Sequence, residues 1–217
     1  MTNKEFDTQF DIFYNNIASN AAPSVNLYEK SVFLTQAQRD IIIGIYNGRE
    51  IPGLSFESTE EARKYLSNLI KEYEVDLEDK NTLIELPNKL WFITLEEVVF
   101  NDDSYECLKN SIMEVTPVRQ DDLHSLLQNP FRGPSERRVL RVDIEGKVKL
   151  YSKYNISKYK VTYLEQPNPI ILDDLSDYES SIEGVTTESE SNINPILHRA
   201  VLERAVALAK AAYIGSK

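Results

Sequence analysis

Apolar residues recur at helical spacing in the first third of the chain. One stripe contains four of them: Phe6, Phe10, Phe13 and Ile17. These intervals are typical of one buried face of an amphipathic helix. A second helix is predicted to begin at the capping-box pattern Thr35–Gln38 and to end at Gly48, a C-cap residue. A third is predicted to begin at a similar pattern, Ser58–Glu61, and to continue through Tyr73.

The middle of the chain alternates between apolar and polar positions, which favours β-strands. The run Leu90–Phe100 is rich in aromatic and β-branched residues, and a second strand is expected around residues 107–115. A short helix is expected after Pro117, and a last strand contains Tyr159 and Tyr163, whose rings share an apolar face with Val161.

One hairpin is predicted in detail between residues 140 and 150. A three-residue turn, Ile144–Gly146, would place Gly146 in the left-handed region. Val142 would then face Val148, and Leu140 would face Leu150.

The last helix has apolar residues around much of its circumference. Asn194 is predicted to cap it and Pro195 to occupy its first position. Two stripes follow, about 100° apart. A helix of this kind needs more than one partner surface, so we expect a neighbouring subunit to cover one stripe, with full burial inside the single chain as the alternative. The candidate interface residues are Leu197, Val201, Leu202, Ala205, Val206, Leu208, Ala209 and Tyr213.

Together these elements predict an α+β fold, in which N-terminal helices and a long C-terminal helix pack on a central, mainly antiparallel β-sheet. The expected core domain is 1–172, helical over 1–73 and mainly β over 82–172. The acidic segment 173–193 has few large apolar residues and is expected to form an exposed or extended arm. Residues 194–217 would form the C-terminal helix.

The net charge of the chain is −11. This charge argues against general binding of nucleic acid, because that binding depends on contacts of Lys and Arg with phosphates. Residues 132–160 contain nine Lys/Arg and three Asp/Glu, whereas residues 161–198 contain eight Asp/Glu and no Lys/Arg. These zones are expected either to pair between two copies of the chain or to stay separately solvated. The residues expected to pair are Arg137, Arg138 and Lys149 with Asp173, Asp174 and Asp177.

Signatures of catalysis are weak. The seven glycines are too dispersed for a phosphate-binding loop, and one Cys with two His gives no metal-ligand spacing. Cys107 and His124 would have to meet as nucleophile and base, but a buried thiol and a helix-surface histidine is the simpler interpretation. His198 is expected to be an exposed polar residue, and Glu96 and Glu97 to be solvated. No catalytic residue, metal or cofactor is predicted. The sequence also has neither an apolar run of transmembrane length nor a signal-peptide pattern at Met1, and its single cysteine is consistent with folding in a reducing cytosol.

Four segments carry a resemblance to a known family. They are 26–38 (NLYEKSVFLTQAQ), 129–134 (NPFRGP), 159–172 (YKVTYLEQPNPIIL) and 197–209 (LHRAVLERAVALA). In these segments, and in their order, the chain resembles the ring, or head-to-tail connector, proteins of crAss-like and related short-tailed bacteriophages.

The resemblance implies a virion structural protein without catalysis, assembled in the host cytoplasm. It implies a ring of copies of the chain, typically twelve, next to a portal protein and other ring or tail proteins. DNA would pass through the channel without specific binding, and no membrane is involved. The alternatives are a cytosolic phage or host adaptor that binds one protein partner, and a cysteine hydrolase that uses Cys107.

Overall fold

The structure is a computed structural model, and it describes residues 1–15, 24–48, 60–77, 83–101, 108–176 and 180–214. Two compact units divide the chain. The first, called the helical unit, combines residues 1–69 with 167–217, and the second, called the sheet unit, is residues 70–166. The linear division expected from the sequence (1–172, 173–193, 194–217) differs from this one, because both ends of the chain fold together while the middle forms its own core.

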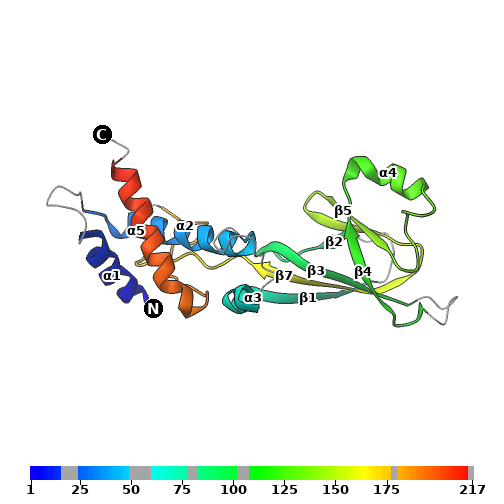
Figure 1. The fold of residues 1–217 in the computed structure, drawn as a ribbon, viewed down its shortest axis with the longest axis horizontal. Coiled ribbons are helices and arrows are strands. Elements are labelled where there is room, and N and C mark those ends of the chain that lie inside the picture. The colour runs from blue at the N-terminus through cyan, green and yellow to red at the C-terminus, as the bar shows by residue number, and fades with distance from the viewer. Residues whose placement is uncertain (16–23, 49–59, 78–82, 102–107, 177–179, 215–217) are drawn as a thin grey trace. The chain divides into compact units, whose positions relative to one another are not determined.

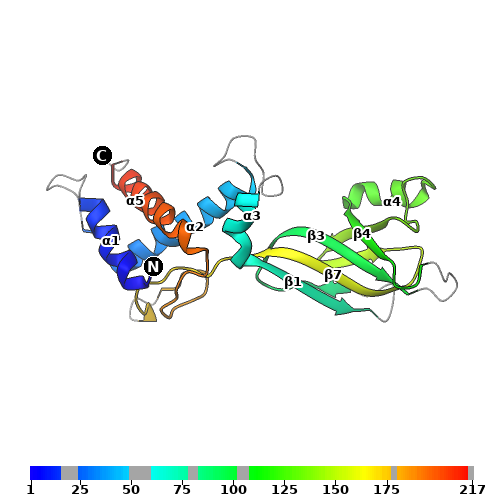
Figure 2. The same cartoon turned by 60° about the horizontal axis from the view of Figure 1, so that its bottom comes forward.

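The helical unit gathers three long helices into one bundle, visible in Figures 1 and 2. They are α1 (Asn3–Asn15), α2 (Leu27–Tyr46) and α5 (His198–Ile214), and the short α3 (Glu60–Leu66) contacts α2. A 3₁₀ turn, Pro195–Leu197, precedes α5, and Asn194 Oδ1 accepts from the Ile196 amide at 3.1 Å, as the capping pattern predicts. On α1 the buried aromatic stripe is Phe6, Phe10 and Tyr14, and Phe13 is only half-buried.

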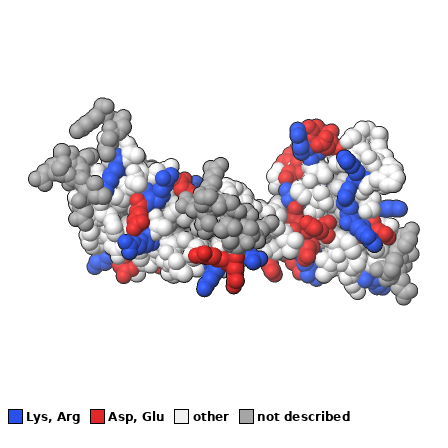
Figure 3. Space-filling view, viewed as in Figure 1, with Lys and Arg blue, Asp and Glu red and all other residues white. Residues whose placement is uncertain are grey.

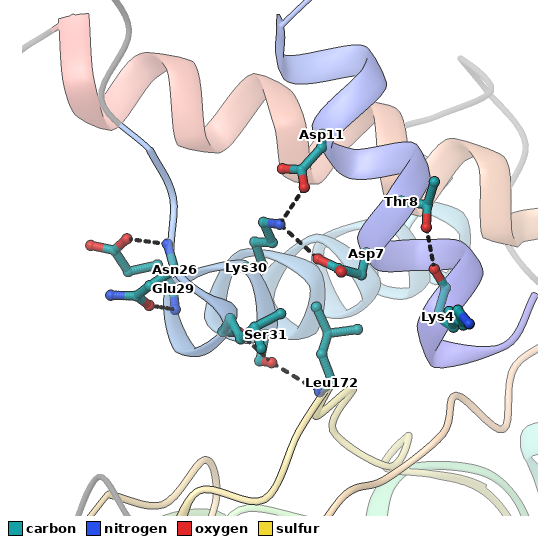
Figure 4. A network of polar contacts seen from close by, with 10 residues as sticks. Lys4, Asp7, Thr8, Asp11, Asn26, Glu29, Lys30, Ser31 and Leu172 are labelled. Carbon is teal, nitrogen blue, oxygen red and sulfur yellow. Dashed lines mark hydrogen bonds and ion pairs between the residues drawn. The ribbon is translucent and has the colours of Figure 1, made fainter.

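The N-cap of α2 lies nine positions before Thr35, so the prediction of a cap at Thr35 is wrong. Asn26 is the N-cap: its side chain accepts from the Glu29 amide at 2.8 Å, and the Glu29 carboxylate accepts from the Asn26 amide at 3.0 Å (Figure 4). Thr35 is 4% exposed inside the helix. Both patterns satisfy the capping-box rule, and tertiary packing decides between them.

A buried lysine joins α1 to α2. Lys30 on α2, whose side chain is 5% exposed, donates to Asp7 at 2.6 Å and to Asp11 at 2.8 Å on α1 (Figure 4). Burial opposes its charge, but these two carboxylates outweigh that effect and raise the pKa of Lys30. The ammonium group therefore stays charged and fixes the two helices to each other.

Polar side chains on one face of α2 bind an extended segment of the helical unit. The Thr35 hydroxyl accepts from the Ile170 amide at 3.1 Å, and the Ser31 hydroxyl accepts from the Leu172 amide at 3.0 Å. Gln38 donates to the Asn168 carbonyl at 2.7 Å. Ser31, Thr35 and Gln38 recur at helical spacing and therefore lie on one face of α2. Their side chains form the hydrogen bonds that the backbone of the extended segment would otherwise form with a neighbouring strand.

The expected acidic arm packs back on the same unit. Over the part of 173–193 that the structure describes there is no α-helix or named strand, yet Leu175 is fully buried and Ile182 is 8% exposed. They join Ile171 in a small core beside Tyr28 and Val32 of α2. Although 173–193 has few large apolar side chains, those few suffice to anchor the segment to the helical unit.

The sheet unit is a single sheet of seven strands within the described residues, in the order β1-β7-β3-β4-β5-β6-β2. The strands are β1 (Ile70–Asp76), β2 (Leu83–Glu85), β3 (Leu90–Phe100), β4 (Ile112–Pro117), β5 (Val139–Ile144), β6 (Lys147–Tyr151) and β7 (Ile156–Glu165). Only the β4–β5 pair is parallel among these strands. Helices precede the strands in the sequence and a helix follows them, and the sheet is mainly antiparallel. The predicted α+β class is therefore confirmed.

The predicted helix from Ser58 to Tyr73 is right only over α3. Its proposed capping residues Ser58 and Thr59 lie outside the described residues. The chain leaves the helix after Leu66 and enters β1 at Ile70, which pairs with Leu164 of β7. Pairing with β7 along the whole of β1 overrides the helical periodicity of residues 69–73.

The hairpin between β5 and β6 is shifted by one residue from the prediction. Its loop has two residues, Glu145 (φ 53°) and Gly146 (φ 75°), so Val142 faces Lys149 rather than Val148. Two positive φ values are typical of a type I′ turn, whose twist matches that of the strands. A one-residue shift exchanges the faces of a strand, so the four apolar residues do not share one face.

Both faces of this hairpin are nevertheless buried. Val148 and Leu150 belong to the main core of the sheet unit, which also contains Val98, Phe100 and Tyr159. Leu140 and Val142 are each 1% exposed and lie on the opposite face, where α4 (Gln120–Gln128) contacts β5 (Figure 1). The alternation of apolar and polar residues on both strands is therefore compatible with the predicted register and with the observed one.

Candidate subunit-interface surfaces

Most of the predicted interface residues on α5 are buried inside the helical unit. Leu197, Val201, Leu202, Ala205, Val206 and Ala209 are at most 6% exposed, and Leu208 and Tyr213 are half-buried. Helices α1 and α2 supply the cover for both stripes. The second partner surface that the sequence argument assigned to a neighbour is thus present in the same chain, and the remaining free face of α5 is the one that carries Ala200, Glu203 and Arg204.

That free face lines a groove between α2 and α5, with a volume of about 690 Å³. Its apolar lining includes Ile41, Ile45 and Leu197, and Gly44 and Ala200 leave it open because their side chains are small. Tyr65 of α3 and the charged residues Asp40, Glu203 and Arg204 complete the lining. This volume lies within the range of roughly 300–1,000 Å³ that is typical of ligand pockets.

The predicted basic zone, residues 132–160, lies in the sheet unit, and most of the acidic zone, residues 161–198, lies in the helical unit. Several charged side chains of these zones already bind a partner of opposite charge within the chain. Lys147 binds Glu85 at 2.6 Å, and Lys158 and Lys160 bind Glu74 at 2.5 and 3.1 Å. On the face drawn in Figure 3, blue and red side chains lie beside one another on each unit. Cross-strand pairing therefore accounts for several cations that the sequence argument left for a neighbour.

The residues named for charge pairing have few ionic partners. Among the described residues no carboxylate binds Arg137, Arg138 or Lys149; Arg138 donates to the Arg132 carbonyl at 3.3 Å, and Lys149 lies 5.4 Å from the centre of the Tyr151 ring. Asp173 and Asp174 are exposed, and Asp177 lies outside the described residues. Hydrogen bonds from Ser176 hold the pKa of Asp174 below its usual value.

A buried charged cluster in the sheet unit was missed by the sequence analysis. Glu96 is 5% exposed, so the prediction that it is solvated is wrong. Arg141 donates to Glu96 at 2.7 Å and to Asp143 at 2.8 Å, and the Tyr159 hydroxyl donates to the other Glu96 oxygen. The sequence contained a signal for this burial. Glu96, Val98 and Phe100 are every second residue of β3, so all three lie on the same buried face.

The electrostatics of this cluster are those of a structural element. Burial opposes the charge of Arg141, but its hydrogen bonds to Glu96 and Asp143 prevail, and its pKa lies above the ordinary value. Burial and the charge of Glu96 raise the pKa of the Tyr159 phenol well above its ordinary value. Because Glu96, Arg141 and Tyr159 come from β3, β5 and β7, their contacts hold these three strands together.

The two histidines differ from each other in environment. His124 lies exposed on α4, as predicted, 3.0 Å from Gln128. His198 is 5% exposed, so its predicted exposure is wrong; it packs against Phe6, and its Nδ1 lies 2.6 Å from the Met1 amine. Burial, followed by the charge of that amine, lowers the pKa of His198. Cys107 lies outside the described residues.

Searches for metal and membrane sites give two findings for the described ranges. No group of three or more His, Cys, Asp or Glu side chains there is placed to hold a metal ion. None of the helices there combines the length and the hydropathy that crossing a membrane requires.

Comparison with known proteins gives consistent relatives. The family model of phage tail ring protein 3/4 matches residues 1–216. Ring protein 3 of Bacteroides phage crAss001 is 48% identical over 219 residues, covering 96% of this chain and 95% of that protein. Ring protein 4/5 of the same phage is 34% identical over 234 residues, covering 99% and 94%.

Proposed function

The chain belongs to the phage tail ring protein 3/4 family, and we propose that it forms one ring of a head-to-tail connector in a crAss-like phage, through which DNA passes. It is a structural protein of the phage particle, similar over nearly its whole length to two ring proteins of one phage. The match over residues 1–216 is the observation that carries the proposal, because it includes both units of the chain.

The proposed role is mechanical and needs no catalysis. A ring subunit requires rigid units and self-complementary surfaces. The buried Lys30 and Arg141 clusters provide rigidity in the two units, because each fixes elements that are distant in sequence. The proposed partners are other copies of the chain, twelve in a ring, together with the portal protein and adjacent ring or tail proteins.

A net charge of −11 suits a channel for DNA. An acidic surface repels the phosphate backbone, so DNA would slide without specific binding. The proposed location is the connector region of the virion, after assembly in the host cytoplasm.

Electron cryomicroscopy of intact particles tests this proposal. We expect density for this chain in the connector, in twelve copies and next to the portal. A different copy number would revise the ring size, and a protein that is absent from purified particles would contradict the proposed function.

A further inference from the structure

The loop after α4 presents a single aromatic side chain to solvent. Phe131 is 91% exposed, more than any other large apolar side chain among the described residues; the next is Ile196 at 60%. Leu127, on the last turn of α4, is 42% exposed. An exposed phenyl ring leaves a large apolar area in water, and burying that area against a partner would be favourable.

This loop is held in one conformation. The Asn129 side chain accepts from the Phe131 amide at 2.9 Å and from the Arg132 amide at 3.2 Å. The Gly133 amide donates to the Asn129 carbonyl at 2.8 Å. A Cβ at position 133 would come within 2.9 Å of that carbonyl and 3.0 Å of the Leu126 carbonyl, so the turn requires glycine. The backbone that presents the ring is therefore pre-organised, and little backbone entropy remains to be lost when the loop binds.

We propose that residues 129–133 of one subunit insert Phe131 into the α2–α5 groove of a second copy of this chain. This inference rests on the proposed ring function and names its subunit contact. The groove offers an apolar lining, with Ile41, Ile45 and Leu197, and an aromatic partner, Tyr65. Its volume of about 690 Å³ takes a phenyl ring together with neighbouring side chains.

Charge favours this pairing over an unrelated apolar site. Arg132, the next residue after Phe131, and Arg137 are exposed and bind no carboxylate among the described residues. At the groove, Asp40 and Glu203 have side chains that are 36% and 51% exposed; they hold Arg204 and Arg199 respectively. Carboxylates keep further acceptor sites when they already bind one arginine, so the incoming guanidinium groups can join them. These exposed contacts set orientation, and the buried ring supplies most of the affinity.

The pairing of two different surfaces also suits a ring. The loop lies in the sheet unit and the groove in the helical unit, so each copy carries one of each. Such a contact is heterologous, and repeating it produces a closed ring when the rotation between neighbours allows closure.

Complementation between two variants tests the proposal. Phe131→Ala removes the inserted ring, and Ala200→Trp fills the groove at an exposed position of α5. Each variant alone should associate about 30-fold more weakly than the wild type, the equivalent of about 2 kcal/mol for an aromatic hot spot. Mixed in equal amounts, they should form a dimer of twice the 24.9 kDa chain mass, because one functional loop still meets one functional groove.

Mass photometry measures these assemblies, and Ile112→Ala, another exposed apolar residue of the sheet unit, is the matched control. The control should assemble as the wild type does. If Phe131→Ala still forms rings as the wild type does, this contact is overturned and the proposed function stays intact. If those Phe131→Ala rings then fail to enter particles, Phe131 binds an adjacent particle protein instead. Variants that fail both alone and when mixed also overturn it. A wild-type chain that forms no multimer would count against both proposals.

Discussion

The buried Glu96–Arg141 pair gives the sharpest prediction of stability. Glu96→Gln keeps the shape of the side chain and an acceptor for Tyr159, but removes the charge that compensates Arg141. The Arg141 side chain is only 12% exposed, so water cannot replace the lost partner. Asp143, 62% exposed, remains as a weaker partner.

The magnitude follows from that geometry. Breaking a buried ion pair from one side costs about 3–5 kcal/mol, and the remaining Asp143 contact places the expected loss near the lower limit, about 3 kcal/mol. With a urea dependence of about 1–3 kcal/mol per molar, the midpoint of unfolding should fall by about 1–3 M.

Fluorescence of Trp91 is the suitable measurement. It is the only tryptophan of the chain and lies on β3, so it reports on the sheet unit. Glu97→Gln is the matched control, because Glu97 is the next residue of the same strand and points to the opposite face. Its effect should stay within about 0.5 kcal/mol.

A double-mutant cycle with Arg141→Met separates the pair from its surroundings. Because Glu96→Gln already removes most of what the arginine gains, the double variant should be more stable than the sum of the single losses predicts, with a coupling of about 0.5–3 kcal/mol. A loss below about 1 kcal/mol for Glu96→Gln, with no coupling, would refute the assignment of this pair as a structural element.

Three further predictions concern other parts of the molecule. Asn26→Ala removes the N-cap of α2 and should cost about 1 kcal/mol, measured by circular dichroism during thermal unfolding; an unchanged midpoint would contradict the observed cap. Because burial lowers the pKa of His198 below its ordinary 6.5, the unfolded chain binds the proton first as pH falls, and the helical unit should lose stability below about pH 6.5. His198→Gln should flatten that pH dependence, and an equal slope in both proteins would exclude His198 as its source. Gly133→Ala places a Cβ against the Asn129 carbonyl and forces the turn that presents Phe131 to shift, so it should lower thermal stability and weaken self-association as Phe131→Ala does; normal assembly of this variant would show that the turn tolerates a side chain.

Local patterns in the sequence were sufficient for much of the secondary structure. The helix α1 with Phe6 and Phe10 buried, the strand Leu90–Phe100, the Asn194–Pro195 start of the last helical segment and the burial of Tyr159 all follow from periodicity and capping chemistry. The predicted stripe of α1 also contained Phe13, where the structure buries Tyr14 instead, and Ile17, which lies outside the described residues. These features depend on neighbours within a few residues, which is the range over which a sequence pattern is directly informative. The resemblance in four ordered segments indicated the ring protein family.

Only the tertiary structure decided how distant segments meet. Two capping boxes compete in α2, and residues 69–73 suit a helix or a strand; in both cases a partner far along the chain makes the choice. The hairpin register depends on the conformation of its two-residue loop, which the spacing of apolar residues does not specify. The same holds for the polar residues. Glu96 and Lys30 are buried because Arg141 in one case, and Asp7 and Asp11 in the other, compensate their charges at short distance. The desolvation of a charge depends on what surrounds it in space, and that information is absent from the spacing of residues along the chain.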